Sequence, residues 1–251
     1  MISKDIFAIS DAADPHILNV GGMPLLVADN FFERPSDIDL LASALDYNID
    51  IRRGAFRQYP GERARISISQ RHVIDWIQHQ LQAQYGAFSF YDFPAVFTRM
   101  NSSALRNADL RQIVPHLDTD SILSVVVHLN RDESETCFYR HVPTGLHYVP
   151  PHPTPEIAIV MKQRGFDALS ASAYLNFKKD IINSTSEEAG AYTNYSGLPF
   201  DTASWKIIHR VPAKWNRLIC FVSNVFHSPV YLPKEAAATG RLTMNIFLQI
   251  V

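Results

Sequence analysis

The sequence predicts a mainly β fold of the α+β class, formed by a single domain of 251 residues. In residues 88–251, short apolar runs are separated by turn residues, a pattern typical of a sandwich or barrel of antiparallel strands. Helical spacing of apolar residues is confined to residues 1–87, expected to be a helical flank, and to an insertion at about 147–199. No repeat or low-complexity linker divides the chain, and all-β units of this length commonly form one domain.

The N-terminal flank is expected to contain one strand and two helices. Residues 23–28 form an apolar, strand-like run. Ser36 is a suitable N-cap for the first helix, because acidic residues follow it in the first turn, where the helix dipole favours negative charge. A second helix is expected from about Ser69 to Tyr85, with Gly86 as its C-terminal stop. Its apolar stripe consists of Val73, Trp76, Ile77, Leu81 and Tyr85.

The β core is predicted from apolar runs between turn signals. Within the insertion, Thr154 precedes Pro155, which is the pattern of an N-cap followed by proline at the first helical position, and Arg164-Gly165 is the expected end of that helix. The expected strands are Phe88–Phe90, Ala95–Asn101, Ile113–Leu117, Ser121–Leu129, Thr136–Arg140, Trp205–Val211, Arg217–Val222 and Arg241–Gln249.

The composition excludes some classes of partner. A formal net charge of −2 gives no reason to expect nucleic acid or an anionic membrane. The N-terminus lacks the apolar core of a signal peptide, and the apolar-leaning run Leu218–Leu232 is too short and too polar to span a bilayer. Cys137 and Cys220 lie in strand-like runs, so buried reduced thiols in a cytoplasmic protein are expected, with a disulfide between them as the open alternative.

Five residues form an ordered pattern that indicates metal chemistry. His116 and Asp118 lie two apart on an expected strand, so their side chains project from the same face. A second imidazole, for which His227 is the candidate, completes a triad of two histidines and one carboxylate, the ligand set of non-haem Fe(II) oxygenases. Arg241, near the start of the last strand, can bind a carboxylate through two charge-assisted hydrogen bonds, and Thr243 points the same way. Along the sequence, the residues of a metal site are therefore followed by the residues of a site for an anionic ligand.

Several other polar residues have simpler structural interpretations. His128 lies in an apolar strand, where a core histidine with satisfied hydrogen bonds is expected. Arg217 stands at a strand start and is expected to be structural. The arginines at 52–53, 63 and 65 are interpreted as a solvated face. Two interpretations of Arg140 stay open: it faces the site together with His141, or it forms a surface salt bridge. His147 and His152 flank prolines and are expected in loops.

The chain resembles the Fe(II)/2-oxoglutarate-dependent oxygenase superfamily, whose fold is a double-stranded β-helix, a form of jelly roll. More narrowly, it is similar to an uncharacterised bacterial group that is sometimes encoded near flavin-dependent tryptophan halogenases. One position departs from that group, since Ser134-Glu135-Thr136 stands where Gly-Gly-Thr is usual. The matching motifs are Tyr59-Pro60-Gly61, Val114-Pro115-His116-Leu117-Asp118, Phe138-Tyr139-Arg140-His141 with Thr144-Gly145, Asn216-Arg217-Leu218 and Phe226-His227-Ser228.

The resemblance implies an Fe(II)- and 2-oxoglutarate-dependent dioxygenase that consumes O2. His116, Asp118 and His227 would be its metal ligands and catalytic centre, and Arg241 with Thr243 would bind 2-oxoglutarate. Related halogenating enzymes lack the metal-binding carboxylate, so the presence of Asp118 favours hydroxylation or desaturation.

Two alternatives stay open at the level of sequence. One is a catalytically inactive, metal-binding jelly roll that serves as an accessory or binding module. The other is a cupin-like isomerase or hydrolase that uses zinc or manganese without 2-oxoglutarate. The substrate, a small molecule or a peptide, is not identified by any motif, and neither is the oligomeric state. The segments 59–65 and 147–199 are the expected substrate loops, and their size suggests a lid.

Overall fold

The fold is described from a computed structural model, in which eleven segments of the chain are placed. Tyr59 and Pro60 of the Tyr59-Pro60-Gly61 motif, and the first residues of the strand predicted at 113–117, lie outside the described residues. The described segments are 4–47, 52–53, 56–57, 61–86, 89–91, 94–100, 115–118, 121–129, 134–183, 197–231 and 241–249.

The larger of two main sheets has seven strands in the order β1-β2-β10-β7-β12-β6-β5, and every neighbouring pair is antiparallel. Its three central strands come from residues 123–248, whereas both edges come from the first 65 residues. Its members are β1 (Asp14–Val20), β2 (Met23–Asp29), β5 (Glu62–Arg65), β6 (Val96–Met100), β7 (Leu123–His128), β10 (Arg217–Val222) and β12 (Arg241–Leu248).

The smaller sheet has three antiparallel strands in the order β11-β8-β9. They are β8 (Ser134–His141), β9 (Trp205–Pro212) and β11 (His227–Tyr231). A short antiparallel pair, β3 (Arg52–Arg53) and β4 (Phe56–Arg57), stands apart from both sheets.

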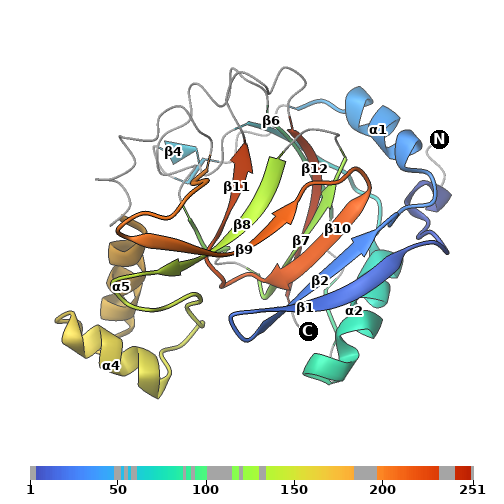
Figure 1. Cartoon of the computed structure of the whole chain (residues 1–251). Helices are drawn as coiled ribbons and strands as arrows, with labels where there is room; N and C mark the ends of the chain where they lie inside the picture. The colour runs from blue at the N-terminus through green and yellow to red at the C-terminus, as the bar shows by residue number, and fades with distance from the viewer. Residues whose placement is uncertain are drawn as a thin grey trace.

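Helices cover the outer faces of the two sheets, so that the molecule is layered (Figure 1). Helices α1 and α2 lie on the side of the larger sheet, and α4 and α5 lie beside the smaller one. Their bounds are η1 (Lys4–Phe7, a 3-10 turn), α1 (Pro35–Ala44), α2 (Arg71–Tyr85), α4 (Pro155–Gln163) and α5 (Ala171–Asn183).

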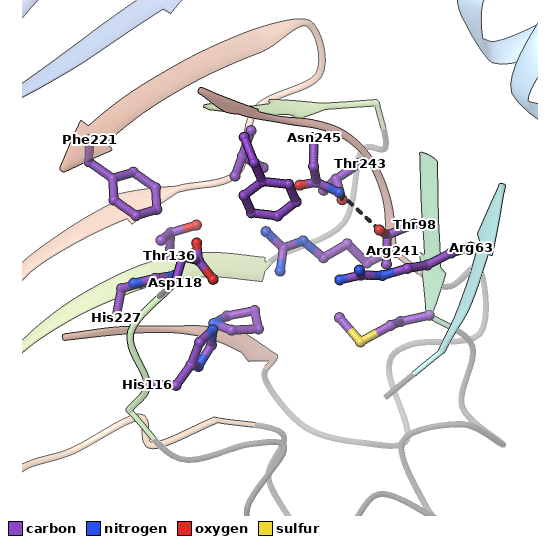
Figure 2. A pocket seen from close by; sticks show the side chains of 14 residues that line it. Arg63, Thr98, His116, Asp118, Thr136, Phe221, His227, Arg241, Thr243 and Asn245 are labelled. Atoms are coloured by element: carbon purple, nitrogen blue, oxygen red, sulfur yellow. Dashed lines mark hydrogen bonds and ion pairs between the residues drawn. The ribbon is translucent and has the colours of Figure 1, made fainter. Parts of the chain in front are cut away.

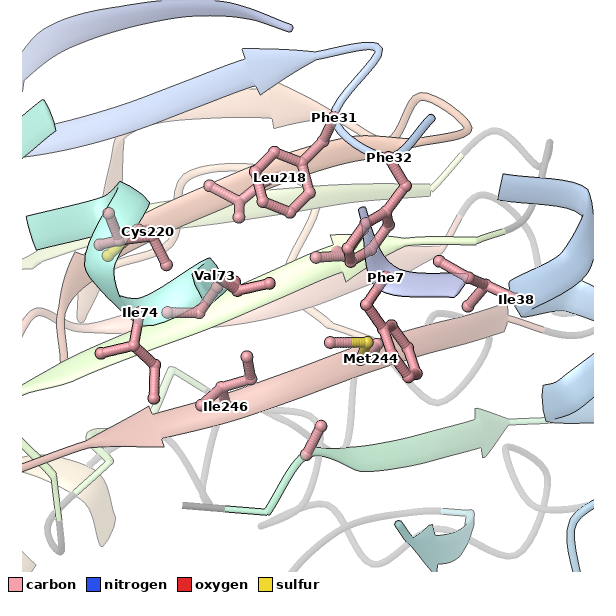
Figure 3. Close-up of a cluster of buried hydrophobic side chains, with 14 of the residues drawn as sticks. Phe7, Phe31, Phe32, Ile38, Val73, Ile74, Leu218, Cys220, Met244 and Ile246 are labelled. Atoms are coloured by element: carbon pink, nitrogen blue, oxygen red, sulfur yellow. The ribbon is translucent and has the colours of Figure 1, made fainter. Parts of the chain in front are cut away.

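The main hydrophobic core lies between the larger sheet and helices α1 and α2. Figure 3 shows Val73 and Ile74 of α2 facing Cys220 of β10 and Ile246 of β12. Phe7 packs edge to face against Phe32, with ring centroids 5.9 Å apart. Burial of these apolar side chains is the main favourable term in folding, and here it fixes the helices to one face of the sheet.

The opposite, inner face of the larger sheet is set by the alternation of side chains along each strand. On β12, Met244 and Ile246 point to the main core, whereas Arg241, Thr243 and Asn245 point between the sheets. The inner face is apolar towards β2 and β10, where it packs on the smaller sheet, and polar towards β12, β6 and β5. The polar half is therefore enclosed by two sheets instead of being open to solvent.

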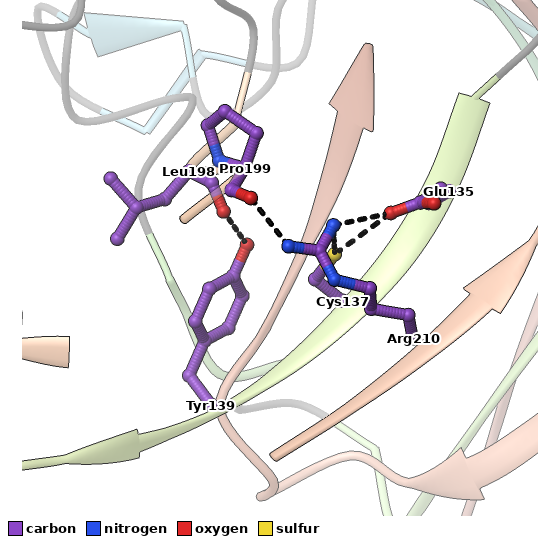
Figure 4. Close-up of polar contacts among 6 residues, drawn as sticks. All are labelled: Glu135, Cys137, Tyr139, Leu198, Pro199 and Arg210. Carbon is purple, nitrogen blue, oxygen red and sulfur yellow. Dashed lines mark hydrogen bonds and ion pairs between the residues drawn. The ribbon is translucent and has the colours of Figure 1, made fainter. Parts of the chain in front are cut away.

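A second core joins the outer face of the smaller sheet to α4 and α5. On the same face, polar contacts hold the segment that precedes β9 (Figure 4). The Tyr139 hydroxyl donates to the Leu198 carbonyl over 2.8 Å, and Arg210 donates to the Pro199 carbonyl. Arg210 also pairs with Glu135 at 2.7 Å. The described part of the insertion thus packs against the far side of the smaller sheet.

Most of the predicted elements are confirmed. The runs at 23–28, 95–101, 121–129, 136–140, 205–211, 217–222 and 241–249 correspond to β2, β6, β7, β8, β9, β10 and β12. Helix α2 ends at Gly86, whose φ of +75° suits glycine. Helix α4 begins after Thr154, whose hydroxyl accepts a hydrogen bond from the Ile157 amide.

Other predictions need correction. Ser36 is not an N-cap, because α1 begins at Pro35 after Arg34. The proline fits the first turn because its missing N–H is not needed there. The flank at 1–87 is only partly helical, since it supplies β1, β2 and β5 to the larger sheet. Helix α5 and β11 were not predicted. Of the strand predicted at Phe88–Phe90, Phe88 lies outside the described residues, and Phe90 makes an isolated bridge instead of a strand.

The two cysteines are separate, buried, free thiols, which confirms that interpretation. Burial raises the pKa of Cys137 to about 12 and raises that of Cys220 as well, so both stay protonated. Among the described residues, none of the helices has the length and apolar character needed to cross a membrane.

Asp29 of β2 and Arg217 of β10 form a poorly exposed ion pair, with Oδ1 and Nε 2.6 Å apart. The Arg217 hydrogen bond lowers the pKa of Asp29 to about 2, although burial opposes this shift, and Lys214 adds to it. Because the folded-state pKa is depressed, the pair stabilises the fold fully above the unfolded-state pKa of about 4 and loses that effect as the pH falls towards 2.

Replacing Asp29 with asparagine should therefore lower the free energy of unfolding at pH 7 by about 2 kcal/mol. The difference from wild type should shrink between pH 4 and pH 2, because the wild-type carboxyl then becomes neutral as well. Urea unfolding at several pH values measures this.

Glu62→Gln, which breaks an exposed pair with Arg99, is the control and should change the free energy of unfolding by less than about 1 kcal/mol. A difference for Asp29→Asn that stays constant down to pH 3 would contradict the assignment.

Candidate metal centre

Two backbone hydrogen bonds hold His116 beside His227, which are the first and the last of the predicted metal ligands along the chain. The His116 amide donates to the His227 carbonyl at 3.0 Å, and the His227 amide donates back to the His116 carbonyl at 3.1 Å. His227 begins β11 and pairs on its other side with Phe138 of β8. From the apolar run at 217–222, His227 is expected to end that strand after a short bend, but it lies at the start of the separate strand β11, after a turn. The two imidazole rings end up with centroids 4.5 Å apart.

Asp118 is held by the residues around the end of β10. Its amide donates to the Ser223 carbonyl at 2.9 Å. Its Oδ2 accepts a hydrogen bond from the Ser124 hydroxyl at 2.6 Å. The Ser223 hydroxyl contacts those of Ser124 at 2.8 Å and Ser121 at 2.7 Å, so a chain of three serines supports the carboxylate. Such a hydrogen-bonded support fixes the rotamer of a potential metal ligand.

The three predicted ligands converge as the sequence indicated. One donor atom from each of His116, Asp118 and His227 lies within 4.8 Å of the other two. The His227 Nδ1 lies 2.9 Å from the Val225 carbonyl, which can only accept, so Nδ1 carries the proton. The Nε2 atom of His227 faces the carboxylate instead, 3.4 Å from Asp118 Oδ2, and it is the ring nitrogen that would supply a lone pair to a bound metal. This arrangement of donors can hold a metal ion.

The carboxylate of Asp118 is ionised in this setting. Burial alone would raise its pKa, because Asp118 is only 7% exposed. The neighbouring His227, together with His116 and the Ser124 hydroxyl, outweighs burial and holds the pKa of Asp118 below its usual range. The site therefore favours a negative oxygen ligand beside two nitrogen ligands, which suits a divalent transition metal.

The triad opens into a cavity between the two sheets (Figure 2). About 650 Å³ of space, part of it open solvent, lies between its walls. The lining comes from β5, β6, β7, β10 and β12 on one side and from β8 and β11 on the other. Val126, Phe221 and Phe247 provide apolar walls.

Arg241 and Thr243 lie where the sequence predicted, in the cavity that holds the triad. Arg241 is 6% exposed, and Figure 2 shows its guanidinium group directed towards the triad. The Asn245 amide donates to Thr243 Oγ1 at 3.1 Å and to Thr98 Oγ1 at 2.9 Å. The wall beside Arg241 is thus a row of hydrogen-bonded polar groups that a polar ligand can contact.

Two lining residues were missed by the sequence analysis. Arg63 was interpreted as part of a solvated face, but it is 9% exposed and lines the cavity. The edge strand β5, which was not predicted, turns it inward. Thr136 of β8 also lines the cavity, and its hydroxyl has no hydrogen-bond partner among the described residues. A buried hydroxyl in this position is a ready contact for a ligand.

His128 is buried as predicted, but its hydrogen bonds are not satisfied. Neither ring nitrogen has a partner within the described part of the chain. In the register of the larger sheet, His128 lies between Thr243 of β12 and Arg217 of β10. Burial, together with the charges of Arg241 and Arg217, holds its pKa well below the usual value, so the ring is neutral. Arg217 is structural, as expected, because it pairs with Asp29.

Few of the described residues in the two expected substrate loops line the cavity. None of the described residues of 147–199 is among those that line it, so the described part of this segment does not support a lid. From 59–65, Arg63 is the described residue that lines it. His141 is not among the residues that line the cavity. It contacts Thr144 at 2.8 Å and packs on Trp205, on the far face of the smaller sheet.

The chain matches one known family over most of its length. The match, to a family described as "Family of unknown function (DUF6445)", covers residues 11–187 and 161–248. No curated protein matches the chain.

Replacing Ser124 with alanine should weaken metal binding roughly 10- to 100-fold, because the carboxylate of Asp118 loses the hydroxyl that orients it. Calorimetric titration of the metal-free protein with Mn(II) measures this. Ser121→Ala is the matched control, since Ser121 contacts Ser223 but not the carboxylate; it should have a smaller effect. Equal Mn(II) affinity in Ser124→Ala and wild type would show that this support is dispensable.

Proposed function

The chain belongs to DUF6445, a family of unknown function, and we propose that it is an Fe(II)- and 2-oxoglutarate-dependent dioxygenase built on a double-stranded β-helix. The observation that carries the proposal is the placement of Arg241 in the same cavity as the convergent donors of His116, Asp118 and His227. Two histidines and one carboxylate form the facial triad of non-haem Fe(II) oxygenases, which leaves metal positions open for other ligands. Two antiparallel sheets that enclose the cavity are compatible with the proposed fold.

The residues present fit iron and 2-oxoglutarate. His116, Asp118 and His227 would hold Fe(II), and Arg241 would bind the distal carboxylate of 2-oxoglutarate through paired hydrogen bonds, with Thr243 beside it. When bound, the two groups would supply activation of O2, with conversion of 2-oxoglutarate to succinate and CO2 and oxidation of the substrate.

The protein's own residues would orient these groups and exclude water. The Nδ1–H of His227 is fixed by the Val225 carbonyl, which aims Nε2 at the metal position. Ser124 holds the Asp118 carboxylate, and Phe221 packs edge to face on the His227 ring at 4.6 Å. Because Asp118 occupies the carboxylate position, we propose hydroxylation or desaturation instead of halogenation.

Anaerobic titration with Fe(II) and 2-oxoglutarate tests the proposal. Chelation of Fe(II) by 2-oxoglutarate should give a weak visible charge-transfer band in the wild-type protein, and His116→Ala should give none because a metal ligand is lost. Arg241→Lys should need at least tenfold more 2-oxoglutarate, since lysine cannot form the paired contact. The proposal fails if the wild type gives no band, or if His116→Ala gives an equal one.

Turnover separates the proposal from its two alternatives. With Fe(II), ascorbate and O2, an oxygenase should convert 2-oxoglutarate to succinate slowly even without its substrate, and Asp118→Ala should abolish this. An inactive accessory module would form no succinate. A zinc or manganese isomerase or hydrolase would bind metal normally but would be indifferent to 2-oxoglutarate and to substitution of Arg241.

A further inference from the structure

The amide side chain of Asn245 organises the polar wall of the cavity. Its Nδ2 atom lies 2.9 Å from Thr98 Oγ1 (Figure 2), 3.1 Å from Thr243 Oγ1 and 3.3 Å from the carbonyl oxygen of Val96. A carbonyl oxygen can only accept a hydrogen bond, so the contact with Val96 fixes which end of the amide is the nitrogen. The Asn245 nitrogen therefore faces all three oxygens.

This orientation sets the direction of the hydrogen bonds to both threonines. An amide nitrogen can only donate, so the hydroxyl oxygens of Thr98 and Thr243 accept from Asn245. Each hydroxyl keeps its own proton, and neither makes a further hydrogen bond within the described part of the chain. Both threonines are buried and line the cavity. Two buried O–H groups are thus left to donate to a ligand that can accept.

The two threonines lie between the metal site and the backbone of Arg241. Ser124, which holds the metal-binding carboxylate, is opposite Phe247 near one end of the wall. On the same strand as Phe247, Thr243 and then Arg241 lie further from that end, and all three face the cavity. Thr98 is directly opposite Thr243 on β6. A ligand that reaches from the metal towards Arg241 therefore lies beside both hydroxyls.

We propose that Asn245 is a positioning residue for 2-oxoglutarate, which makes Thr98 and Thr243 donate hydrogen bonds to the distal carboxylate. This inference rests on the proposed function, because that function places the carboxylate beside Arg241. Thr98 thereby joins the ligand-binding groups, whereas Asn245 acts only through the two threonines. A carboxylate accepts hydrogen bonds and donates none, so it complements a wall that presents two O–H donors. A methyl group in the same place would leave both donors without a partner.

The affinity for 2-oxoglutarate tests this role in the full-length protein. It is measured without oxygen, from the visible charge-transfer band of the Fe(II)-loaded protein. Asn245→Leu keeps a side chain of similar size but removes the amide. It should weaken 2-oxoglutarate binding about tenfold, because the hydroxyls lose the contact that directs their protons. Thr98→Val and Thr243→Val, which each remove one donor with little change of shape, should each weaken binding about fivefold.

Three further readouts separate positioning from a merely structural role. Asn245→Leu should bind Mn(II) within about threefold of the wild-type affinity, which shows that the fold and the metal site are intact. The wild type and Asn245→Leu should bind 2-oxopentanoate, in which a methyl group replaces the distal carboxylate, with similar affinity. In the double variant Thr98→Val/Thr243→Val, the addition of Asn245→Leu should cause no further loss of 2-oxoglutarate affinity, because the groups through which Asn245 acts are already gone.

Unchanged 2-oxoglutarate affinity in Asn245→Leu would overturn the inference while the proposed function stands. An equal loss of affinity for 2-oxopentanoate would do the same, and so would a loss from Asn245→Leu that is undiminished in the double threonine variant. If Asn245→Leu binds no Mn(II), Thr98→Val decides, and unchanged 2-oxoglutarate affinity in that variant would overturn the inference. Absence of the band from the wild type would instead overturn the proposed function itself.

Discussion

The reciprocal backbone hydrogen bonds between His116 and His227 are the constraint on which the candidate site depends. They join residues that are far apart in sequence, at 3.0 and 3.1 Å, and set the two imidazoles side by side. The Asp118 amide, bonded to Ser223 after β10, then fixes the third donor. Because backbone groups make all three links, they set the positions of the three residues, whereas contacts of the side chains with Ser124 and the Val225 carbonyl orient the donor atoms.

Strand alternation gives the cavity its chemical character. The same strands that send Met244 and Ile246 to the main core send Arg241, Thr243 and Asn245 inward. One half of the inner face is apolar and binds the sheets together, whereas the other half is polar and lines the cavity. Stability and proposed function are thus divided between parts of the same sheets, which makes substitutions of the inward polar residues suitable probes of function.

Much of the fold and of the site follows from local sequence patterns. The strands β2, β6, β7, β8, β9, β10 and β12 have strong apolar runs between turns, and the triad with Arg241 is recognisable from the order of its members. Local sequence patterns do not predict strands that form only because they pair with a neighbouring strand in the tertiary structure. The edge strand β1 is mostly exposed, and β5 reads Glu-Arg-Ala-Arg, so neither has a strong apolar signal. Arg63 was missed for that reason, since only pairing with β6 turns it inward.

The central claim is that His116, Asp118 and His227 hold iron in a cavity where Arg241 binds 2-oxoglutarate. Anomalous diffraction at the iron edge, from crystals of the protein loaded with Fe(II) and 2-oxoglutarate without oxygen, tests this most directly. The account predicts an iron peak coordinated by these three side chains, with the distal carboxylate of 2-oxoglutarate against the Arg241 guanidinium. An iron peak elsewhere, or 2-oxoglutarate bound with that carboxylate away from Arg241, would contradict it.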